Sequence, residues 1–458
     1  MLRDERPDRQ RRQTIATPRP TYHRDPAIND TVPASGSGSR VIRSIGWLLA
    51  SRLFNAAASL VYLAALTRSL GLAEFGTFAV ILATAQLVYG LLDFNTWQVI
   101  VQYGTPHYVR NDRQALRRLT HFGMLLEFAS AGVAMLVVLL FFPLLAARFG
   151  WSGATADTAL YFILFFQLCF RSTALGLLRV SEHFREGAMA EAAMPSLRLI
   201  GALIVAFYAP SLRNFLIVWA ISEAALAIAF WYFALTRVPQ RLRGNPFGSV
   251  RQALREEQGL WRFAWVTNLG AVFSTANQQF VTLATGLWLG TSAAGLFRIG
   301  YQLGQAMARL AEVISRSLYT EFNRMRASER IDDLNAMVRR TNRIAIASGA
   351  LLITALLIAG GDLLLLVAGP AYVAALPILL LMACAAIVEL VCATYQAALT
   401  TRGHAGSALI VRLVATVTLL VALRPLIDGF AANGAATAIL LAALVAYLGF
   451  VLLLRRIR

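Results

Sequence analysis

The chain has 458 residues, of which 58% are hydrophobic and 14% are charged, and its mean hydropathy is +0.60. Apolar segments of about 20 residues recur along the whole length, which argues against a water-soluble fold and predicts transmembrane helices. All of the 42 basic residues are arginine, and the formal net charge is +18. Because these arginines lie mostly in loops between apolar segments, the charge indicates membrane topology and anionic lipid, and not nucleic acid.

Residues 1–40 are rich in Arg, Asp, Pro and Ser and contain no apolar segment, so we expect a disordered cytoplasmic tail without a signal peptide. Twelve apolar spans follow, near 45–67, 76–97, 121–145, 157–178, 187–208, 214–236, 260–287, 295–318, 343–367, 373–399, 406–424 and 433–454. Residues 239–258 separate the sixth span from the seventh and have the pattern of an amphipathic helix. We therefore predict two lobes, 41–238 and 259–458, joined by this cytoplasmic linker.

The distribution of arginine sets the predicted orientation. Thirty-one arginines lie in the tail, in or next to the loops after each even-numbered span, and at the C-terminus, whereas the alternate loops contain four. Positive residues concentrate on the cytoplasmic side of membrane proteins. The sequence thus predicts a multi-pass protein with both termini in the cytoplasm.

The two halves share a weak repeat with a constant offset. Gly71, Gly76 and Phe78 correspond to Gly290, Gly295 and Phe297, each pair 219 residues apart. Gln86 and Asp93 fall on Gln305 and Glu312 at the same offset. Since each half contains six spans, the halves have the same orientation in the membrane. The predicted fold is an all-α polytopic membrane protein, with about 12 transmembrane helices in two six-helix lobes related by this internal repeat.

The eighth span carries charges through the depth of the membrane. At 100° per residue, Arg298, Arg309, Glu312 and Arg316 fall on one face of a helix about 27 Å long. A charge at the bilayer centre costs about 2.5–3.5 kcal/mol on insertion scales, so such residues face a wet cavity or pair with each other. Three arginines share the stripe with one acid, which favours a cavity that binds an anion, with pairing along the helix as the alternative.

Three sets of residues form the predicted site. The cavity arginines expected to bind substrate are Arg309, Arg316, Arg298, Arg171 and Arg52. The expected polar lining is Gln305, Gln86, Tyr301, Tyr89, Asn268 and Asn55. The acids that are candidates for proton coupling are Glu312, Asp93, Glu127 and Glu389. An Arg171–Glu389 ion pair between the lobes is a further hypothesis, whereas Arg198 (with Glu191) and Arg412 are interpreted as structural.

The LG-x4-G-x-F pattern at 70–78, its recurrence at 289–297 and the segment LVAGPAYVAALPILLLMA at 366–383 resemble bacterial O-antigen and exopolysaccharide flippases. These belong to the multidrug/oligosaccharidyl-lipid/polysaccharide exporter superfamily. The resemblance implies two lobes that rock between inward-open and outward-open states. It also implies export of an undecaprenyl-diphosphate-linked oligosaccharide from the cytoplasmic to the periplasmic leaflet of the inner membrane, with polysaccharide polymerases as candidate partners. Arginine suits that substrate because its planar fork binds phosphate oxygens in pairs.

Three other functions stay open at this point: a cation-coupled multidrug exporter of the same superfamily, a lipid II flippase, and a membrane-embedded polysaccharide polymerase or ligase. The three cysteines and five histidines form no metal-ligand pattern, and no phosphate-binding GxxxxGK[ST] loop is present. We therefore expect no catalytic residue, no metal and no cofactor, and a transporter that is not an enzyme.

Overall fold

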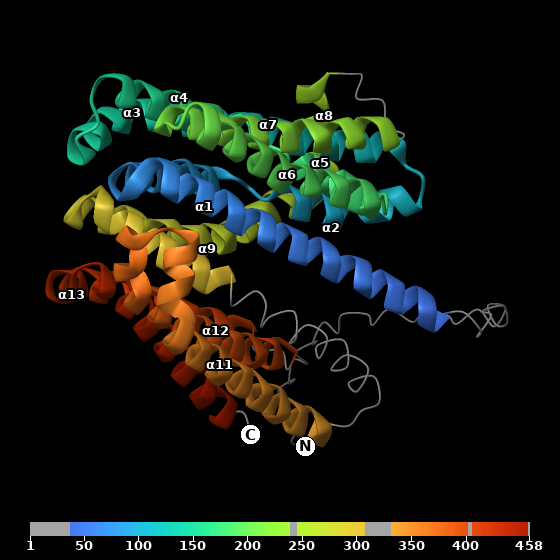
Figure 1. The fold of residues 1–458 in the computed structure, drawn as a ribbon. Helices are drawn as coiled ribbons and strands as arrows, with labels where there is room; N and C mark the ends of the chain where they lie inside the picture. Colours follow the sequence, from blue (N-terminus) through green and yellow to red (C-terminus); the bar gives the residue numbers. More distant parts are fainter. Residues whose placement is uncertain (1–36, 239–244, 307–330, 402–404, 457–458) are drawn as a thin grey trace, which may run out of the picture. The chain divides into compact units, whose positions relative to one another are not determined.

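The computed structural model describes residues 37–238, 245–306, 331–401 and 405–456 (Figure 1). Residues Ser51–Arg458 form one compact unit, and the contacts reported below lie within it. The helices of the first half are α1 (Ser37–Leu92), α2 (Thr96–Val109), α3 (Arg113–Phe149), α4 (Gly153–Gln167), α5 (Ser172–Val180), α6 (Phe184–Tyr208) and α7 (Leu212–Arg237). The rest are α8 (Pro246–Glu256), α9 (Leu260–Leu289), a helical segment at 291–306, α11 (Ile331–Val367), the 3-10 helix η1 (Pro370–Ala375), α12 (Leu376–Thr401) and α13 (Ala405–Arg456).

These helices have the length and composition of membrane spans. Eight stretches of the described residues are long and apolar enough to cross a membrane. Two of them, Ala57–Val109 and Gly406–Arg456, are 53 and 51 residues long and each is interrupted by a non-helical residue, so each is long enough for two crossings. Together with α9 and the segment at 291–306, they are consistent with the predicted twelve.

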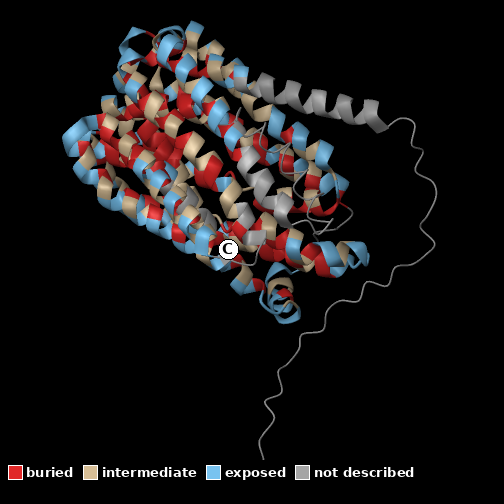
Figure 2. Cartoon of the chain, turned by 90° about the horizontal axis from the view of Figure 1, so that it is seen from below, coloured by how far each residue is buried: buried red, intermediate tan, exposed pale blue. Residues whose placement is uncertain are grey.

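The outer faces of the helices are apolar. Leu140, Phe207 and Ile358 are 66%, 82% and 79% exposed, and Figure 2 shows exposed residues on outward helix faces with buried residues between the helices. Large hydrophobic side chains that face outward are expected where lipid, and not water, surrounds the protein. The predicted all-α polytopic membrane fold is confirmed.

The helices pack in two groups that correspond to the halves of the sequence. In the first half α2, α3, α4, α5, α6 and α7 contact one another, and in the second half α13 contacts α9 and α12, and α12 contacts α11. Helix α9 also contacts α2 and α3 of the first half. Helix α8 occupies part of the predicted linker and is anchored to the first half. Its anchors are the His107 Nε2–Glu257 Oε1 contact of 2.6 Å and the Arg118–Glu256 ion pair of 2.8 Å.

The backbone carries the repeat that the sequence indicates. Gly71 interrupts α1 with φ 69° and ψ 179°, and its repeat partner Gly290 ends α9 with φ 89° and ψ 170°. A positive φ of this kind is open to glycine and strained for other residues. A third pair, which the sequence reading missed, has the same offset of 219 residues: Gly150 after α3 and Gly369 before η1 both have positive φ.

The two halves meet closely at the end of the molecule where these glycines lie. A Cβ atom on Gly76 would lie 1.8 Å from the carbonyl oxygen of Thr291 and 3.3 Å from the nitrogen of Gly295, so the helices touch through their backbones. Nearby, the Tyr372 hydroxyl donates to the Gly71 carbonyl at 3.1 Å, and Arg68 Nη2 donates to the Leu366 carbonyl at 2.5 Å. These contacts close one end of the interface between the halves.

Two predicted spans are wrong in detail. The span near 76–97 is interrupted at 93–95, between α1 and α2. The segment near 157–178 is not one continuous helix, because 168–171 separate α4 from α5. The freed backbone groups are satisfied by side chains: Trp231 Nε1 donates to the Phe170 carbonyl at 3.1 Å, and Arg171 Nη1 donates to the Cys169 carbonyl at 3.2 Å. Tertiary contacts therefore stabilise a break that contains neither glycine nor proline.

Candidate functional site

Two helix breaks lie side by side in the first half of the chain. The first comprises 93–95, between α1 and α2, where Asn95 has a left-handed conformation with φ 46°. The second comprises 168–171, between α4 and α5. Helices α2 and α5 pack together, and the Trp97 backbone nitrogen donates to Ser172 Oγ at 3.1 Å, so the two breaks bring two helix N-termini next to each other.

Glu127 of α3 binds both N-termini. Its Oε1 atom accepts from the Thr173 backbone nitrogen at 2.5 Å, from the Thr173 hydroxyl at 2.7 Å, and from the Thr96 hydroxyl. A helix N-terminus has free N–H groups and a partial positive charge, both of which favour a carboxylate. The Glu127 side chain is 4% exposed, and its second oxygen, Oε2, has no hydrogen-bond partner.

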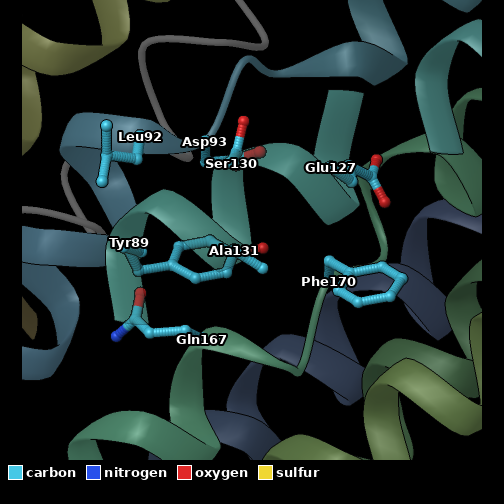
Figure 3. Close-up of a pocket in the computed structure, with 9 residues that line it drawn as sticks. Tyr89, Leu92, Asp93, Glu127, Ser130, Ala131, Gln167 and Phe170 are labelled. Carbon is cyan, nitrogen blue, oxygen red and sulfur yellow. The ribbon is translucent and has the colours of Figure 1, made fainter. Parts of the chain in front are cut away.

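A small cavity lies next to Glu127, with a volume of about 20 Å³. Figure 3 shows its lining side chains, which come from the C-terminal end of α1 and its break, from α3, and from the C-terminal end of α4 and its break. The lining residues are Tyr89, Leu92, Asp93, Glu127, Ser130, Ala131, Ala134, Gln167 and Phe170. Two of the acids predicted for proton coupling, Asp93 and Glu127, thus line one cavity.

An ion network adjoins this cavity. Glu223 of α7 is paired with Arg171 Nη1 at 3.0 Å and with Arg198 Nη2 at 2.5 Å. Arg198 also donates to Ser222 Oγ at 2.9 Å and stacks 3.6 Å above the Trp219 ring. The interpretation of Arg198 as structural agrees with these contacts, but its partner is Glu223 and not Glu191.

Arg298 lies in the helical segment at 291–306, one turn after Gly295, where this segment crosses α1. Its Nη1 atom donates to Gln279 Oε1 at 3.3 Å, and the side chains of Tyr301 and of Tyr62 in α1 lie near its guanidinium. Tyr62 also lies near Arg198. Among the described residues no carboxylate forms an ion pair with Arg298, so none of the carboxylates that the structure describes neutralises its charge.

The predicted pair of Arg171 with Glu389 is wrong. Arg171 binds Glu223, and Glu389 of α12 binds Arg412 Nη1 of α13 at 2.7 Å. Each lobe neutralises its own arginine, because the nearest carboxylate is on an adjacent helix of the same lobe. The structural interpretation of Arg412 agrees with this contact.

The structure describes the other predicted site residues to different extents. Gln305, Gln86, Tyr301 and Tyr89 are partly buried, and Asn268 is 4% exposed with an unpartnered Oδ1 atom. Arg52 and Asn55 belong to α1, where the structure describes the helix alone. Arg309, Glu312 and Arg316 lie outside the described residues, so the stripe beyond Ala306 stays a prediction.

The sequence reading passed over Gln167, Ser130 and Glu223 as site residues. A local signal for the breaks was nevertheless present: Asp93-Phe94-Asn95-Thr96 and Arg171-Ser172-Thr173 place capping residues inside apolar stretches. Such residues mark helix starts. Two helix starts within predicted spans would have indicated the breaks.

Comparison with known proteins fits this architecture. The inner membrane protein YghQ of Escherichia coli K12 is 28% identical over 343 residues, which cover 75% of this chain and 96% of YghQ. The lipid II flippase MurJ in its inward closed conformation matches with a TM-score of 0.68 and 12% identity, over 91% of this chain and 87% of MurJ. An inward-facing multidrug resistance MATE transporter of the MOP superfamily matches with a TM-score of 0.67 and 12% identity, over 89% of this chain and 97% of that one.

The solved structures show a shared fold, and the family model is more specific. The model of polysaccharide biosynthesis proteins matches residues 41–319, which is more than half of the chain. The resemblance read from the LG-x4-G-x-F motifs is confirmed at the level of the family. The chain therefore belongs to the polysaccharide biosynthesis protein family and has the fold of MOP superfamily transporters.

Proposed function

We propose that the protein moves an undecaprenyl-diphosphate-linked oligosaccharide repeat unit from the cytoplasmic to the periplasmic leaflet of the bacterial inner membrane, for O-antigen or exopolysaccharide synthesis. The family description names polysaccharide biosynthesis, and the MurJ match is a flippase for another lipid-linked saccharide. The YghQ match is an inner membrane protein. Polysaccharide polymerases that use the exported unit are the expected partners.

The observation that carries this proposal is the charge of Arg298, which no carboxylate in the described part of the chain neutralises. An arginine inside a membrane-spanning unit needs an anion or water, because burying a lone charge costs several kcal/mol. Gln279 and Tyr301 supply only neutral contacts. A diphosphate would supply the counter-charge for Arg298. The neighbouring polar and aromatic side chains suit contacts with sugar rings. Arg309, Arg316, Arg171 and Arg52 are the further arginines proposed for the substrate path.

The closed end of the lobe interface supports alternating access. With both termini in the cytoplasm, the Gly71 and Gly290 turns face the periplasm, so the Tyr372–Gly71 and Arg68–Leu366 contacts close the periplasmic side. The two lobes, 41–238 and 259–458, would separate there to release the unit. The sequence has no phosphate-binding loop, so an ion gradient, the membrane potential or product removal drives the cycle, with Asp93, Glu127, Glu312 and Glu389 as candidate coupling acids.

The test is complementation of a strain that lacks this gene. We expect Arg298→Ala to reduce surface polysaccharide at least tenfold, since a charge-assisted contact to phosphate contributes roughly 1.5–3 kcal/mol. Arg424→Ala is the matched control, because Arg424 already pairs with Asp428 at 3.0 Å in an exposed position. Membrane levels of both variants are measured in the same cells.

Two results would contradict the proposal. The first is normal surface polysaccharide in Arg298→Ala at normal protein level. The second is robust proton-driven uptake of a fluorescent organic cation into inverted vesicles, which would assign the protein to multidrug export. Flipping of a lipid-linked oligosaccharide in proteoliposomes that contain this protein alone would rule out a polymerase or ligase.

A further inference from the structure

We propose that the groove between α4 and α7 of the first half binds one phospholipid that carries an amine in its headgroup, of the phosphatidylethanolamine type. The lipid phosphate contacts Arg213, its ammonium group contacts Asp157, and one acyl chain lies along the groove. The site goes beyond the proposed export function, because a lipid of the bilayer binds here whether or not a lipid-linked sugar is transported.

The groove is large enough for a lipid chain and mainly apolar. Its volume is about 690 Å³, within the range of roughly 300–1,000 Å³ that is typical of ligand sites. Helix α4 forms one wall and packs against α3 and α7, which complete the groove (Figure 1). It shares no lining residue with the small cavity beside Glu127. The apolar side chains of its walls include Phe162, Leu164, Phe165, Leu168, Leu216 and Ile217.

The groove opens toward the membrane. Tyr161, Phe165 and Leu168 are 69%, 40% and 49% exposed, and they follow one another at about one-turn spacing along α4 to its C-terminal cap. Ile217 on the facing helix α7 is 43% exposed. In a membrane such a surface is covered by hydrocarbon and not by water. The occupant is therefore a lipid chain, since a water-soluble ligand would have to displace hydrocarbon from a mainly apolar surface.

The length of the groove matches one leaflet of a bilayer. Leu168 follows Asp157 by 11 residues, which corresponds to a rise of about 16 Å along the helix. Half of a hydrocarbon core of about 30 Å is roughly 15 Å. The charged residues lie at one end of the groove, and the helix break at 168–171 lies at the other. A chain whose headgroup lies at the charged end therefore reaches the break near the bilayer centre.

The charged end presents one acid and one base that are not paired with each other. Asp157 lies near the start of α4 and Arg213 in the first turn of α7, and both are exposed. In the described part of the chain neither of them forms an ion pair. A phosphate would pair with Arg213, and an ammonium group with free N–H donors would pair with Asp157. A purely anionic headgroup would leave Asp157 without a cation, and a choline headgroup has no N–H to donate.

Arg213 also stands out among the arginines of its side of the membrane. It is one of the four that the sequence places in the loops opposite the cytoplasm. Two of the others have partners in the protein: Arg68 donates to the Leu366 carbonyl, and Arg424 pairs with Asp428. Arg213 instead lies at a helix N-terminus, where the partial positive charge of the helix disfavours a cation. A phosphate at this position would stabilise both the arginine and the helix end.

The second half of the repeat lacks both charges. At the offset of 219 residues, Asp157 and Arg213 correspond to Leu376 and Ala432. The backbone repeats nearby, since Gly150 and Gly369 both have positive φ at this offset. The fold itself therefore requires neither charge. Their joint presence in the first half is expected if they bind the two charged groups of one ligand.

The experiment is native mass spectrometry of the purified full chain released from detergent. Phosphatidylethanolamine, phosphatidylcholine and phosphatidylglycerol with identical acyl chains are titrated in turn, without lipid-linked sugar. We expect one phosphatidylethanolamine to be retained in preference to the other two lipids. Arg213→Gln should weaken its retention about fivefold, as expected for loss of an exposed ion pair of up to about 1 kcal/mol. Arg148→Gln is the matched control, an exposed arginine in the last turn of α3 that does not line the groove.

Two further variants separate the headgroup from the chain. Asp157→Asn should remove the preference for phosphatidylethanolamine over phosphatidylcholine, because the carboxylate that distinguishes the two amines is lost. Ile217→Trp narrows the groove, keeps both charges and should reduce retention of all three lipids. Its control is Ile221→Trp, one turn farther along α7 at a 56% exposed position outside the groove.

Equal retention of phosphatidylethanolamine and phosphatidylcholine by the wild type would overturn the proposal, as would stronger retention of phosphatidylglycerol. An unchanged preference in Asp157→Asn, or a loss in Arg148→Gln as large as that in Arg213→Gln, would have the same consequence. Displacement of phosphatidylethanolamine by an equal concentration of undecaprenyl phosphate, which has no amine, would assign the groove to a polyprenyl chain instead. None of these measurements involves transport, so a failure of the proposed export function would leave the lipid site intact.

Discussion

Replacing Glu223 by glutamine removes the carboxylate that Arg171 and Arg198 share. Glu223 is 6% exposed and Arg198 is 13% exposed, so the charge of Arg198 would remain buried without a counter-ion. Breaking a buried ion pair from one side costs roughly 3–5 kcal/mol. The contacts of Arg198 with Ser222 and Trp219 exist in the wild type as well, so they do not reduce this loss. Arg171 is 28% exposed and can recover water, and we therefore count one uncompensated charge and not two.

The expected readout is the apparent melting temperature of the purified protein. One kcal/mol shifts a domain of 150–250 residues by about 2–4 °C, and the shift shrinks with length, so we expect a decrease of roughly 3–10 °C. Glu186→Gln is the matched control, since its partner Arg237 is 57% exposed and such a pair contributes below about 1 kcal/mol. Arg198→Met in the Glu223→Gln background removes the stranded charge and should recover part of the loss. If Glu223→Gln melts at the temperature of the control, the charge of Arg198 is not stranded by loss of the Glu223 carboxylate, and the reasoning is refuted.

Three further changes test other parts of the molecule. Gly76→Val should separate the two halves, because its Cβ would lie 1.8 Å from the Thr291 carbonyl oxygen. Disulfide cross-linking between cysteines introduced by Arg68→Cys and Leu366→Cys should therefore fall. Gly132→Val is the control and should leave the cross-linking unchanged, because no atom lies within 4 Å of its Cβ. Tyr372→Phe removes the bond to the Gly71 carbonyl and, at about 1 kcal/mol, should lower the same cross-linking equilibrium about fivefold, whereas the exposed Tyr232→Phe should not. Hydrogen bonds from the Ala115 and Gln114 amides at the start of α3 lower the pKa of Asp112. Its stabilisation is therefore complete above the unfolded-state pKa of about 3.9 and lost as pH falls through the lower folded-state pKa; Asp112→Ala should cost about 0.5–2 kcal/mol at pH 7 and nothing at the lowest pH, as measured by the melting temperature.

The sequence was sufficient for the spans and for the repeat, because both depend on local patterns. Apolar length predicts a membrane helix, and Gly71 and Gly290 were visible as a pair before their shared conformation was known. The third pair, Gly150 and Gly369, was missed since the residues around it differ between the halves, although the backbone does not.

The cavity could not be predicted, because it depends on contacts between helices far apart in the chain. Glu127 and Thr173 are 46 residues apart, and Gln167 reaches a carbonyl 82 residues away. Arg171 was misassigned for the same reason: a helical wheel shows which face a residue occupies, but Glu223 on another helix decides its partner. Intramembrane charge singled out Arg171 and Arg198 in the sequence, and tertiary packing decides that both pair with Glu223.

The crossing of Gly76 with Gly295 locates a symmetry axis. In a twofold assembly a residue on the axis contacts its own copy, and these two glycines are copies of each other in the repeat. The pseudo-twofold axis that relates the lobes therefore passes between them. Any side chain added on the axis meets its counterpart, and two such side chains double the obstruction. Separation of the lobes at this end, as the proposed cycle requires, therefore breaks a contact between two backbones that lie on the axis itself.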